Sequence, residues 1–352
     1  MRRIVQAAVM APSAENTQPW QFAVDRDTLI IFLDMTRTLE SDLGHMLSLT
    51  AIGASIENAA IAATVERLHS NVQILVESAP TQGATLHVPI AEIRFVEGAT
   101  RDPLVDQIES RSTGRRMDHR RQVDADKLDQ LTKSCDAFTD ASVHWVGSRQ
   151  LREFSHLIGI GNRIRLEYQP FHQELYHNLR FTTAEADRTR DGLDVATLQL
   201  PPGLSKILAA LRTWPRMKWA NLLGFSRFVA RQAAQEVYRS GAVGILSVGG
   251  PESQQFVQGG RALERVWLTA TCLGLCFHPT ASLPVFMAYA NAGAPHLSSS
   301  DRSCVADMSE RFYGLFPELS GRTVQMAFRV GYGPTPHVRS LRRSIDEVLQ
   351  FK

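Results

Sequence analysis

The spacing of hydrophobic residues divides this chain into helices and strands. Apolar residues recur at helical spacing from Ile4 to Ala11, which predicts an amphipathic helix at the start. Short apolar-rich segments then predict buried strands, at 21–24, 28–33, 72–76, 91–96, 142–146, 244–248, 274–277 and 324–330. Helical patterns separate them, from Ser41 or Asp42 to about His69, from Pro103 to Arg111, from Asp124, and over 150–185, 204–211, 217–238 and 252–273, with a closing helix from Ile345. Strands interleaved with long helices predict a layered α/β or α+β fold.

The first helix is followed by a polar segment that two prolines keep out of helical conformation. Residues 11–20 read Ala-Pro-Ser-Ala-Glu-Asn-Thr-Gln-Pro-Trp, and Pro12 and Pro19 fix their own φ and stop the helix. Hydroxyl and amide groups on such a segment can donate and accept hydrogen bonds along the edge of a flat heterocycle, and here they belong to Ser13, Asn16 and Gln18. The alternative is a polar turn that Trp20 anchors in the core.

Four segments together resemble the FMN-dependent nitroreductase family. Residues 11–20 resemble its A-P-S-x-x-N-x-Q-P-W segment. Residues 111–118, Arg-Ser-Thr-Gly-Arg-Arg-Met-Asp, resemble its phosphate-binding signature R-x-S-x-R-x-F-D, with Met117 in place of phenylalanine. Residues 260–275 resemble its long central helix. Residues 331–334, followed by 342–349, resemble its closing strand and basic phosphate clamp.

The resemblance implies an α+β, nitroreductase-like fold in which helices wrap a mixed central sheet. In the family the phosphate-binding element precedes the N-x-Q-P-W element, whereas here the order is reversed. Two fused nitroreductase-like halves, 1–98 and 99–352, explain that order, and one FMN would lie between them in a pseudo-dimer. A chain of this order and size most resembles the mycobacterial Acg-like branch, and it is compatible with a monomeric pseudo-dimer or with a homodimer.

The resemblance also assigns cofactor-binding roles, residue by residue. The FMN phosphate is a dianion that arginine forks bind bidentately; the matching residues are Arg111, Arg115, Arg342 and Arg343, with hydroxyl donors from Ser112 and Thr113. From the first half, Ser13, Asn16 and Gln18 would meet the isoalloxazine and ribityl edge. In the second half, the backbone of Thr280 and Ala281 would approach the flavin's reactive nitrogen. For each arginine alone the alternative is a surface charge. No catalytic acid, base or nucleophile is assigned, and Arg261 and Glu264 are expected to form a helix pair.

Three functions follow from the resemblance. The first is an FMN-dependent oxidoreductase of the nitroreductase type, which moves hydride between NAD(P)H or an organic substrate and an acceptor such as a nitroaromatic or a quinone. The second is an FMN-dependent dehydrogenase, or oxidase, of natural-product biosynthesis, and the third is a flavin-storing protein whose lid closes the pocket. Residues 166–239, which carry aromatic and basic side chains, are the expected lid, and an ordinary helical packing layer is the alternative.

Composition narrows the expected partners and location. The chain has 38 Lys+Arg against 36 Asp+Glu, so neither a nucleic acid nor a membrane is an expected partner. No apolar run approaches the ~20 residues of a membrane span, and no signal peptide is visible, so a cytoplasmic protein is expected. The chain opens directly inside a helix, as would a domain cut from a longer protein or a family member with a reduced first unit.

The four cysteines do not make a disulfide framework in a chain of this length. Cys272 and Cys276 lie one helical turn apart if the helix continues there, and His278 is the one further candidate ligand close by. A metal site would need two more soft ligands, so reduced structural cysteines and no metal are expected.

Overall fold

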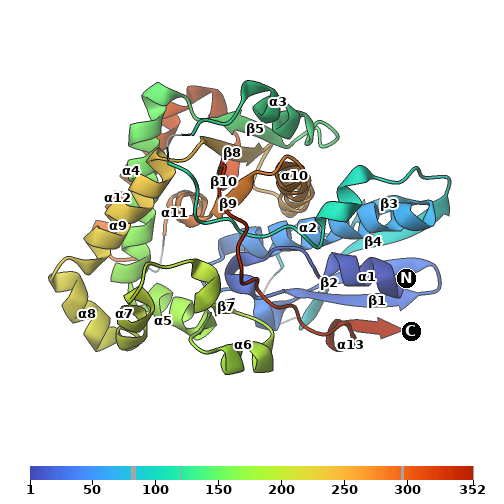
Figure 1. The fold of residues 1–352 in the computed structure, drawn as a ribbon, viewed down its shortest axis with the longest axis horizontal. Coiled ribbons are helices and arrows are strands. Elements are labelled where there is room, and N and C mark those ends of the chain that lie inside the picture. The colour runs from blue at the N-terminus through green and yellow to red at the C-terminus, as the bar shows by residue number, and fades with distance from the viewer. Residues whose placement is uncertain (81–84, 120, 295–296, 352) are drawn as a thin grey trace.

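The strands form two sheets, and a pair of helices lies between them (Figure 1). The computed structural model describes residues 1–80, 85–119, 121–294 and 297–351. One sheet has five strands in the order β11 (Leu349–Phe351), β1 (Trp20–Asp25), β2 (Thr28–Asp34), β4 (His87–Glu97) and β3 (Leu68–Ile74). The other has four, in the order β5 (Ser142–Trp145), β8 (Ala242–Val248), β10 (Thr323–Gly331) and β9 (Cys276–Thr280). The expected α+β class with a mixed sheet is confirmed, because β1 is parallel to β11 and antiparallel to β2.

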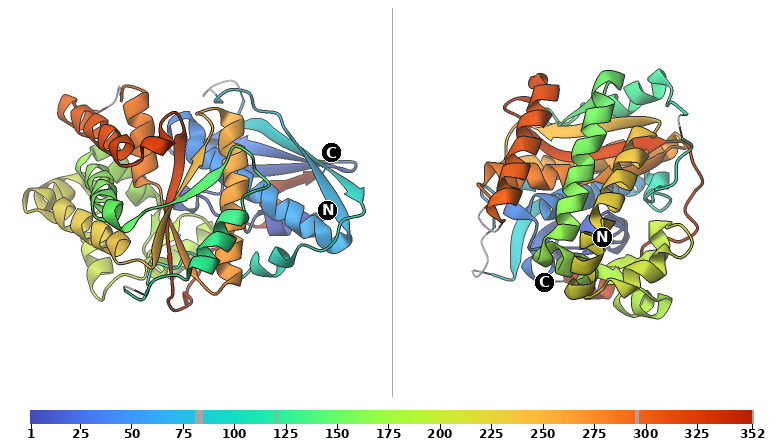
Figure 2. Two further views of the ribbon diagram at one scale, coloured as in Figure 1. Left: turned by 90° about the horizontal axis from the view of Figure 1, so that it is seen from above. Right: turned by 90° about the vertical axis from the view of Figure 1, so that its left-hand side faces the viewer.

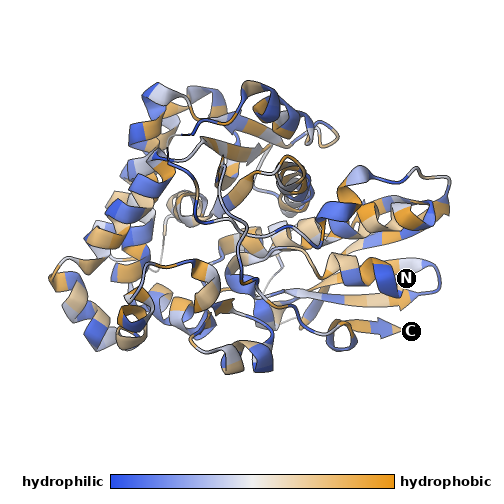
Figure 3. Cartoon of the chain, in the orientation of Figure 1, coloured by the Kyte–Doolittle hydropathy of each residue, from blue (hydrophilic) through white to orange (hydrophobic). Residues whose placement is uncertain are grey.

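The helices α2 (Met46–Ala63) and α10 (Ser253–Cys272) form the centre of the molecule. Every residue of α2 except Ala60 and Ala62 is buried, since the helix packs on the five-stranded sheet on one side and on α10 on the other. The helices α4 (Ser148–Glu167) and α9 (Phe225–Tyr238) lie on the outside of the molecule (Figure 2). They are amphipathic, and hydrophilic and hydrophobic residues alternate along them (Figure 3). The expected central core helix, rich in small residues, is therefore confirmed.

The sequence segment around α2 also has the composition of a membrane span. Leu43–Glu66 is long and apolar enough to cross a membrane, so the expectation that no segment approaches this length is wrong for it. In the structure, 89% of its apolar window is buried inside the protein. Its apolarity has a packing cause, because a helix covered on all sides has no polar face.

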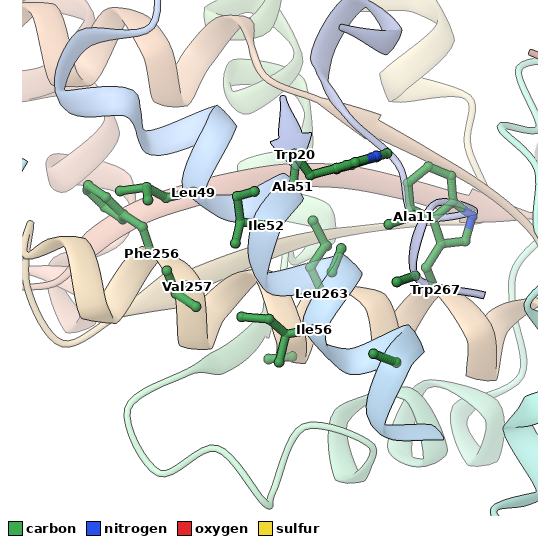
Figure 4. Close-up of a cluster of buried hydrophobic side chains, with 14 of the residues drawn as sticks. Ala11, Trp20, Leu49, Ala51, Ile52, Ile56, Phe256, Val257, Leu263 and Trp267 are labelled. Carbon is green, nitrogen blue, oxygen red and sulfur yellow. The ribbon is translucent and has the colours of Figure 1, made fainter. Parts of the chain in front are cut away.

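The two central helices touch backbone to backbone at Gly53 and Gly260. A Cβ atom on Gly53 would lie 2.1 Å from the carbonyl oxygen of Val257, and one on Gly260 would lie 2.2 Å from that of Thr50. Figure 4 shows the apolar side chains around this crossing, with Ile52 and Ile56 of α2 and Val257 and Leu263 of α10 in one cluster. Glycine at both positions thus sets the separation of the helices.

Gly53→Ala should push the central helices apart and lower the free energy of unfolding by about 1–3 kcal/mol, the usual range for overpacking. Gly314→Ala in α12 (Ser299–Leu315) is the matched control, because nothing lies within 4 Å of its added Cβ. That control should be neutral or up to about 1 kcal/mol more stable, since alanine is the better helix former. Urea denaturation of both variants measures the difference, and equal stabilities would contradict the close crossing.

Two long predicted helices are divided in the structure. The helix predicted over 150–185 is α4, α5 (Gln169–Asn178) and α6 (Thr183–Thr189), because Pro170 cannot continue the hydrogen-bond ladder of α4. The helix predicted over 217–238 is α8 (Trp214–Leu222) and α9, separated by Gly224 at φ 94°. The first helix, α1 (Arg2–Ala8), and the helices α3 (Ala125–Lys133) and α7 (Leu204–Ala210) lie where the pattern predicts them.

Other boundaries shift by a few residues. The helix predicted to reach His69 ends at Ala63, and β3 already begins at Leu68. The helix predicted from Pro103 is a short 3-10 turn, Pro103–Gln107, so Arg111 follows in irregular chain. The helices α11 (Ser282–Asn291) and α12 and the short parallel pair β6 (Leu179–Arg180) and β7 (Leu193–Asp194) were not predicted.

The C-terminal segment crosses the molecule to complete the first sheet. After β10 the chain runs to α13 (Ile345–Val348) and β11, which pairs in parallel with β1 through Phe22 and Leu349. The closing helix predicted from Ile345 is present but is a single turn, and β11 is an addition to the prediction. This crossing brings residues 339–343 beside residues 11–20, which we call the N-terminal loop. The crossing therefore assembles the site described next.

Candidate functional site

A cavity of about 410 Å³ lies where the N-terminal loop, the segment 111–115, the C-terminal segment and α5, α7 and α11 meet. Small-molecule and cofactor sites typically fall in the range of about 300–1,000 Å³. Its charged lining includes four arginines and two glutamates, namely Arg111, Arg115, Arg165, Arg342, Glu15 and Glu174, and Arg165 pairs with Glu15. Its apolar lining includes Leu175, Leu198, Trp267 and Phe286. The cavity therefore suits a ligand with an anionic group and a flat or apolar body.

The N-terminal loop is held in an unusual backbone conformation. Three non-glycine residues lie in the left-handed region, Glu15 at φ 50°, Asn16 at φ 55° and Gln18 at φ 53°, and such conformations persist only where surrounding contacts enforce them. Gln18 supplies such contacts, because its Oε1 accepts from the backbone N–H of Arg343 at 2.8 Å and its Nε2 donates to the carbonyl of Arg190 at 2.8 Å. Its amide thus fixes the loop and lies outside the cavity lining.

Asn16 lines the cavity, and its amide positions a neighbouring arginine. Its Nδ2 donates to the carbonyls of Gly192 at 2.9 Å and Leu341 at 3.1 Å, and its Oδ1 accepts from Arg342 Nη1 at 3.0 Å. Since the amide is turned to these partners, Asn16 acts on the cavity mainly by orienting the Arg342 guanidinium.

The segment 111–115 is docked against the edge of β9. Thr113 bridges to Phe277, and the Gly114 N–H donates to the Phe277 carbonyl at 3.0 Å. Only glycine fits at 114, because a Cβ there would lie 2.6 Å from the Cβ of Cys276. The Arg111 guanidinium lies 4.5 Å from the centre of the Trp267 ring, a cation–π distance. The segment thereby presents Arg111, Thr113 and Arg115 to one cavity.

The buried Arg111 and the half-buried Arg342 donate to one carbonyl, and only Arg111 pairs with a carboxylate. Arg111 Nη2 donates to the Met10 carbonyl at 2.8 Å, and Arg342 Nη2 donates to the same oxygen at 3.2 Å. Arg111 Nε lies 3.2 Å from Glu264 Oε1, whereas Arg342 has no ion pair within the described part of the chain. Two cations with one carboxylate leave an excess of buried positive charge, which favours a bound anion.

An unused donor and shifted pKa values support this interpretation. The Nε atom of Arg342 is buried without a hydrogen-bond partner among the described residues, whereas Arg111 Nε faces Glu264. Burial, and then the neighbouring Arg111, lower the pKa of Arg342 to about 9, which still leaves it charged at pH 7. Burial raises the pKa of Glu264 to about 7, against the opposing effect of Arg111. Partial protonation of this carboxyl at neutral pH increases the excess positive charge.

A neutral histidine also lines the cavity. Burial, and then the charges of Arg329 and Arg115, hold the pKa of His278 well below its ordinary value of 6.5. Arg329 Nε donates to His278 Nδ1 at 2.9 Å. Because arginine can only donate, the ring proton resides on Nε2. His278 is thus a neutral group with a single N–H donor.

Residues 166–239 cover part of the cavity. They contribute Phe171, Glu174, Leu175, Leu179, Leu193, Leu198 and Leu208 to its lining. The segment has a small core of its own, which includes Tyr176, Val195 and Met217. It therefore forms a structured wall of the cavity.

This wall is tied to both sides of the site. Arg115 Nη1 donates to the Thr197 carbonyl at 2.9 Å, and the backbone N–H groups of Arg115 and Arg116 both donate to Gln199 Oε1 at 3.0 Å. Arg37 Nη1 pairs with Asp191 Oδ2 at 3.0 Å. The wall is consequently fastened to the segment 111–115 and to the chain after β2.

Comparison with known proteins relates the N-terminal part of the chain to nitroreductases. Residues 1–54 match the model of a family described as "Putative TM nitroreductase". The match includes the N-terminal loop, the whole of β1 and β2, and the first turns of α2.

One curated relative matches almost the whole chain. It is the uncharacterized protein MT1398 of Mycobacterium tuberculosis (strain CDC 1551 / Oshkosh), 27% identical over 350 residues, which are 97% of this chain and 47% of that protein. The chain thus spans about half the length of this relative.

Among solved structures, similar chains include two flavin enzymes. One is a nitroreductase with bound FMN from Bacteroides fragilis NCTC 9343, at 12% identity and a TM-score of 0.36, covering 69% of this chain and 95% of that one. The other is the FMN-dependent nitroreductase NfnB from Mycobacterium smegmatis in complex with NADPH, at 14% identity and a TM-score of 0.38, covering 70% and 96%.

The structure brings most of the predicted cofactor-binding residues to one cavity. Its lining includes Ser13, Asn16, Arg111, Thr113, Arg115, Ala281 and Arg342. Four predicted residues, Ser112, Gln18, Thr280 and Arg343, lie outside the lining. The carbonyl of Ser112 accepts from Trp267 Nε1 at 3.3 Å, Thr280 pairs with Ala327 inside the four-stranded sheet, and Arg343 Nε pairs with Glu347 at 3.5 Å.

The expected helix pair of Arg261 and Glu264 is wrong. Arg261 Nε pairs instead with Glu57 of α2 at 2.9 Å, and Glu264 is buried against Arg111. Gln199 and Trp267 are further, unpredicted neighbours of residues 111–115, which we call the arginine segment. Trp267 falls in the predicted central helix on the same face as Leu263, so helical periodicity could have placed it toward the core; Gln199 carried no such signal.

Proposed function

We propose that this chain binds FMN in the cavity and acts as an FMN-dependent oxidoreductase of the nitroreductase type. The carrying observation is the meeting of Arg111, Thr113 and Arg115 with Arg342 and Asn16, from three distant parts of the sequence, around one cavity. The match of residues 1–54 to a nitroreductase family model supports the same assignment for the N-terminal loop.

In this proposal the phosphate of FMN is held by Arg111, Arg115, Arg342 and Thr113. The excess positive charge and the unused Nε donor of Arg342 fit a dianion, since each arginine can offer it charge-assisted hydrogen bonds. Ser13, Asn16 and Ala281 would lie along the rest of the cofactor, and Trp267 and Phe286 give the cavity apolar surface.

When bound, the flavin supplies the hydride chemistry, and the protein supplies binding, orientation and electrostatics. The Asn16 amide and the Met10 carbonyl orient Arg342, and the wall 166–239 limits the access of water. His278 offers a neutral N–H donor to the cavity and no charge. We further propose that the site is shared by two fused halves, 1–98 and 99–352, because the N-terminal loop precedes α2 in the sequence whereas residues 111–115 follow β4.

The test is reconstitution of the purified chain with FMN and with riboflavin, followed by anaerobic reduction monitored near about 450 nm, where oxidised flavin absorbs. FMN should bind and riboflavin should bind far more weakly. Bleaching by NADH or NADPH would support the oxidoreductase and name its donor. Absence of FMN binding would overturn the proposal.

Flavin storage is a second candidate function, favoured by one observation. The wall 166–239 is fastened to the arginine segment through Thr197 and Gln199 and to the chain after β2 through Asp191. A fastened wall would keep a nicotinamide from stacking on the flavin. In the same titration, a flavin that dithionite bleaches but neither NADH nor NADPH bleaches would favour storage, or a dehydrogenase reduced only by its own organic substrate.

A further inference from the structure

The outer face of α7, α8 and α9 combines exposed apolar side chains with an unbalanced positive charge. Among the largest exposed hydrophobic residues of the described structure, Trp219 is 71% exposed, Leu222 70% and Leu223 89%. Phe228 in α9 and Ile207 in α7 are about half exposed. Large apolar side chains gathered at one exposed place indicate an interaction site rather than an ordinary surface.

The three most exposed residues share one side of α8. Trp219, Leu222 and Leu223 are separated by three and four positions, which places them together on a helical surface. Gly224 then starts α9 in left-handed conformation, so Leu223 stands at the tip of the turn between the helices. Figure 1 and the left-hand view of Figure 2 both place α8 at the end of the molecule opposite the five-stranded sheet.

The charge of this region departs from the balance of the whole chain. Between Asp194 and Glu236 there is no acidic residue, and six basic residues are present, namely Lys206, Arg212, Arg216, Lys218, Arg227 and Arg231. All six are exposed, and none forms an ion pair with the described residues. By contrast, the chain as a whole has 38 basic and 36 acidic residues.

Neighbouring acidic groups are engaged elsewhere. Glu167 at the end of α4 accepts from Ser226 Oγ at 2.7 Å and lies 3.6 Å from Arg163, and Glu236 pairs with Arg329 at 2.8 Å. Arg212 lies near Glu185 and 5.8 Å from the centre of the Phe181 ring. The positive charge of the other five basic residues is left for a partner outside the chain.

We propose that this face, which we call the α8 face, docks the protein on an anionic lipid bilayer. Tryptophan and leucine insert at the boundary between head groups and acyl chains, and basic residues around them bind anionic head groups. Lys218 is one turn before Leu222, and Arg216 is one turn before Trp219, so cations flank the apolar residues on the same helix. The balanced charge of the whole chain hides this local pattern.

The docked orientation places the wall of the cavity next to the bilayer. In α7, Ile207 is exposed on the outside while its neighbour Leu208 lines the cavity. The docking proposal itself is independent of the cofactor, since no residue of the α8 face named above as inserting or as binding head groups lines the cavity.

Co-sedimentation of the full chain with phosphatidylcholine vesicles, with and without phosphatidylglycerol, tests the proposal. Binding should require phosphatidylglycerol. Leu222→Ser with Leu223→Ser should weaken it by roughly tenfold or more, because two exposed apolar anchors are lost. Lys218→Gln with Arg227→Gln should weaken it roughly 30-fold, from two lost head-group contacts.

The matched control is Leu86→Ser with Arg94→Gln, which removes one exposed leucine and one exposed arginine from the five-stranded sheet region. Its binding should equal that of the unaltered chain. All substituted residues are exposed, so circular dichroism should show an unchanged fold in every variant. Absence of binding to anionic vesicles would overturn the proposal, as would equal losses in the control. A dimer that the leucine variant dissolves, without vesicle binding, would overturn it in favour of a protein partner.

Discussion

Replacing Arg111 by alanine should lower the free energy of unfolding by about 3–5 kcal/mol at pH 8, because it leaves the buried Glu264 carboxylate without its counter-charge. FMN affinity should fall about 10- to 150-fold in the same variant, the range for a lost hydrogen bond to a charged group. A reading of the motif alone would expect lost cofactor and an unchanged fold; the buried ion pair predicts both losses.

The stability loss should depend on pH. The pKa of Glu264 in the folded chain is about 7, above its ordinary value of 4.5, so the folded state holds this proton more tightly than the unfolded state. A raised carboxyl pKa contributes stability below pH 4.5 that is lost as the pH rises to about 7. Without Arg111 the pKa should rise further, so the loss should be small at pH 5 and large at pH 8.

Urea denaturation at both pH values, with flavin fluorescence for affinity, measures these effects. Arg111→Ala combined with Glu264→Gln should recover most of the stability at pH 8 while FMN stays weakly bound. Arg101→Ala, which removes an exposed pair with Asp106, is the control and should change stability by less than about 1 kcal/mol. A pH-independent loss in Arg111→Ala would contradict the assigned role of Glu264.

Replacing Arg342 by glutamine should weaken FMN binding about 10- to 150-fold and leave riboflavin binding unchanged. The two flavins differ only in the phosphate, so the ratio of their affinities isolates the arginine's proposed partner. Folding should tolerate this change better than Arg111→Ala, because Arg342 is in no ion pair with the described residues and glutamine keeps an N–H donor for Asn16.

Arg343→Gln is the control for this experiment, as the neighbouring residue in the same segment. Its side chain turns to Glu347 and lies outside the cavity lining, so FMN affinity should stay within about twofold of the unaltered chain. Isothermal titration of the unaltered chain and of both variants with each flavin gives the six affinities. An equal loss of affinity for FMN and riboflavin in Arg342→Gln would argue against a phosphate contact. A loss of FMN affinity in Arg343→Gln alone would show that the phosphate binds Arg343 instead.

The two neighbouring arginines illustrate what a linear motif leaves open. Both match the basic clamp in the sequence, and only their positions in the crossing C-terminal segment separate them. Arg342 is turned to Asn16 and the Met10 carbonyl, whereas Arg343 uses its backbone N–H to hold Gln18. The direction of a side chain in irregular backbone depends on distant contacts, and local propensity carries no information about it.

The electrostatics of the site were equally hidden. Arg261 and Glu264 are spaced as a helix pair, yet burial of α10 against α2 turns them to different partners, Glu57 and Arg111. An exposed pair at this spacing would gain little, while a buried carboxyl must find a cation wherever the packing offers one. Pairing in a core is decided by which groups lose water together, and this is known only once the helices are packed.

The sequence by itself determined the elements and the identity of the arginine segment. Hydrophobic periodicity located nearly every strand of the two sheets and both central helices, because one period decides which face of an element is buried. It also marked the proline-bounded loop and the small residues of α2. Pro170 and Gly224, where two predicted helices are divided, are residues that commonly end helices, although the hydrophobic pattern continues on both sides of them.

Only the tertiary structure decided that these pieces form one cavity. The return of β11 to β1 places Arg342 beside the N-terminal loop, and the wall 166–239 closes over residues that the motifs had already singled out. The net charge likewise gave no sign of the α8 face, because charge becomes a surface property only when folding decides which side chains remain in water. Contacts between residues hundreds of positions apart arise from packing and chain crossing, and no local pattern encodes them.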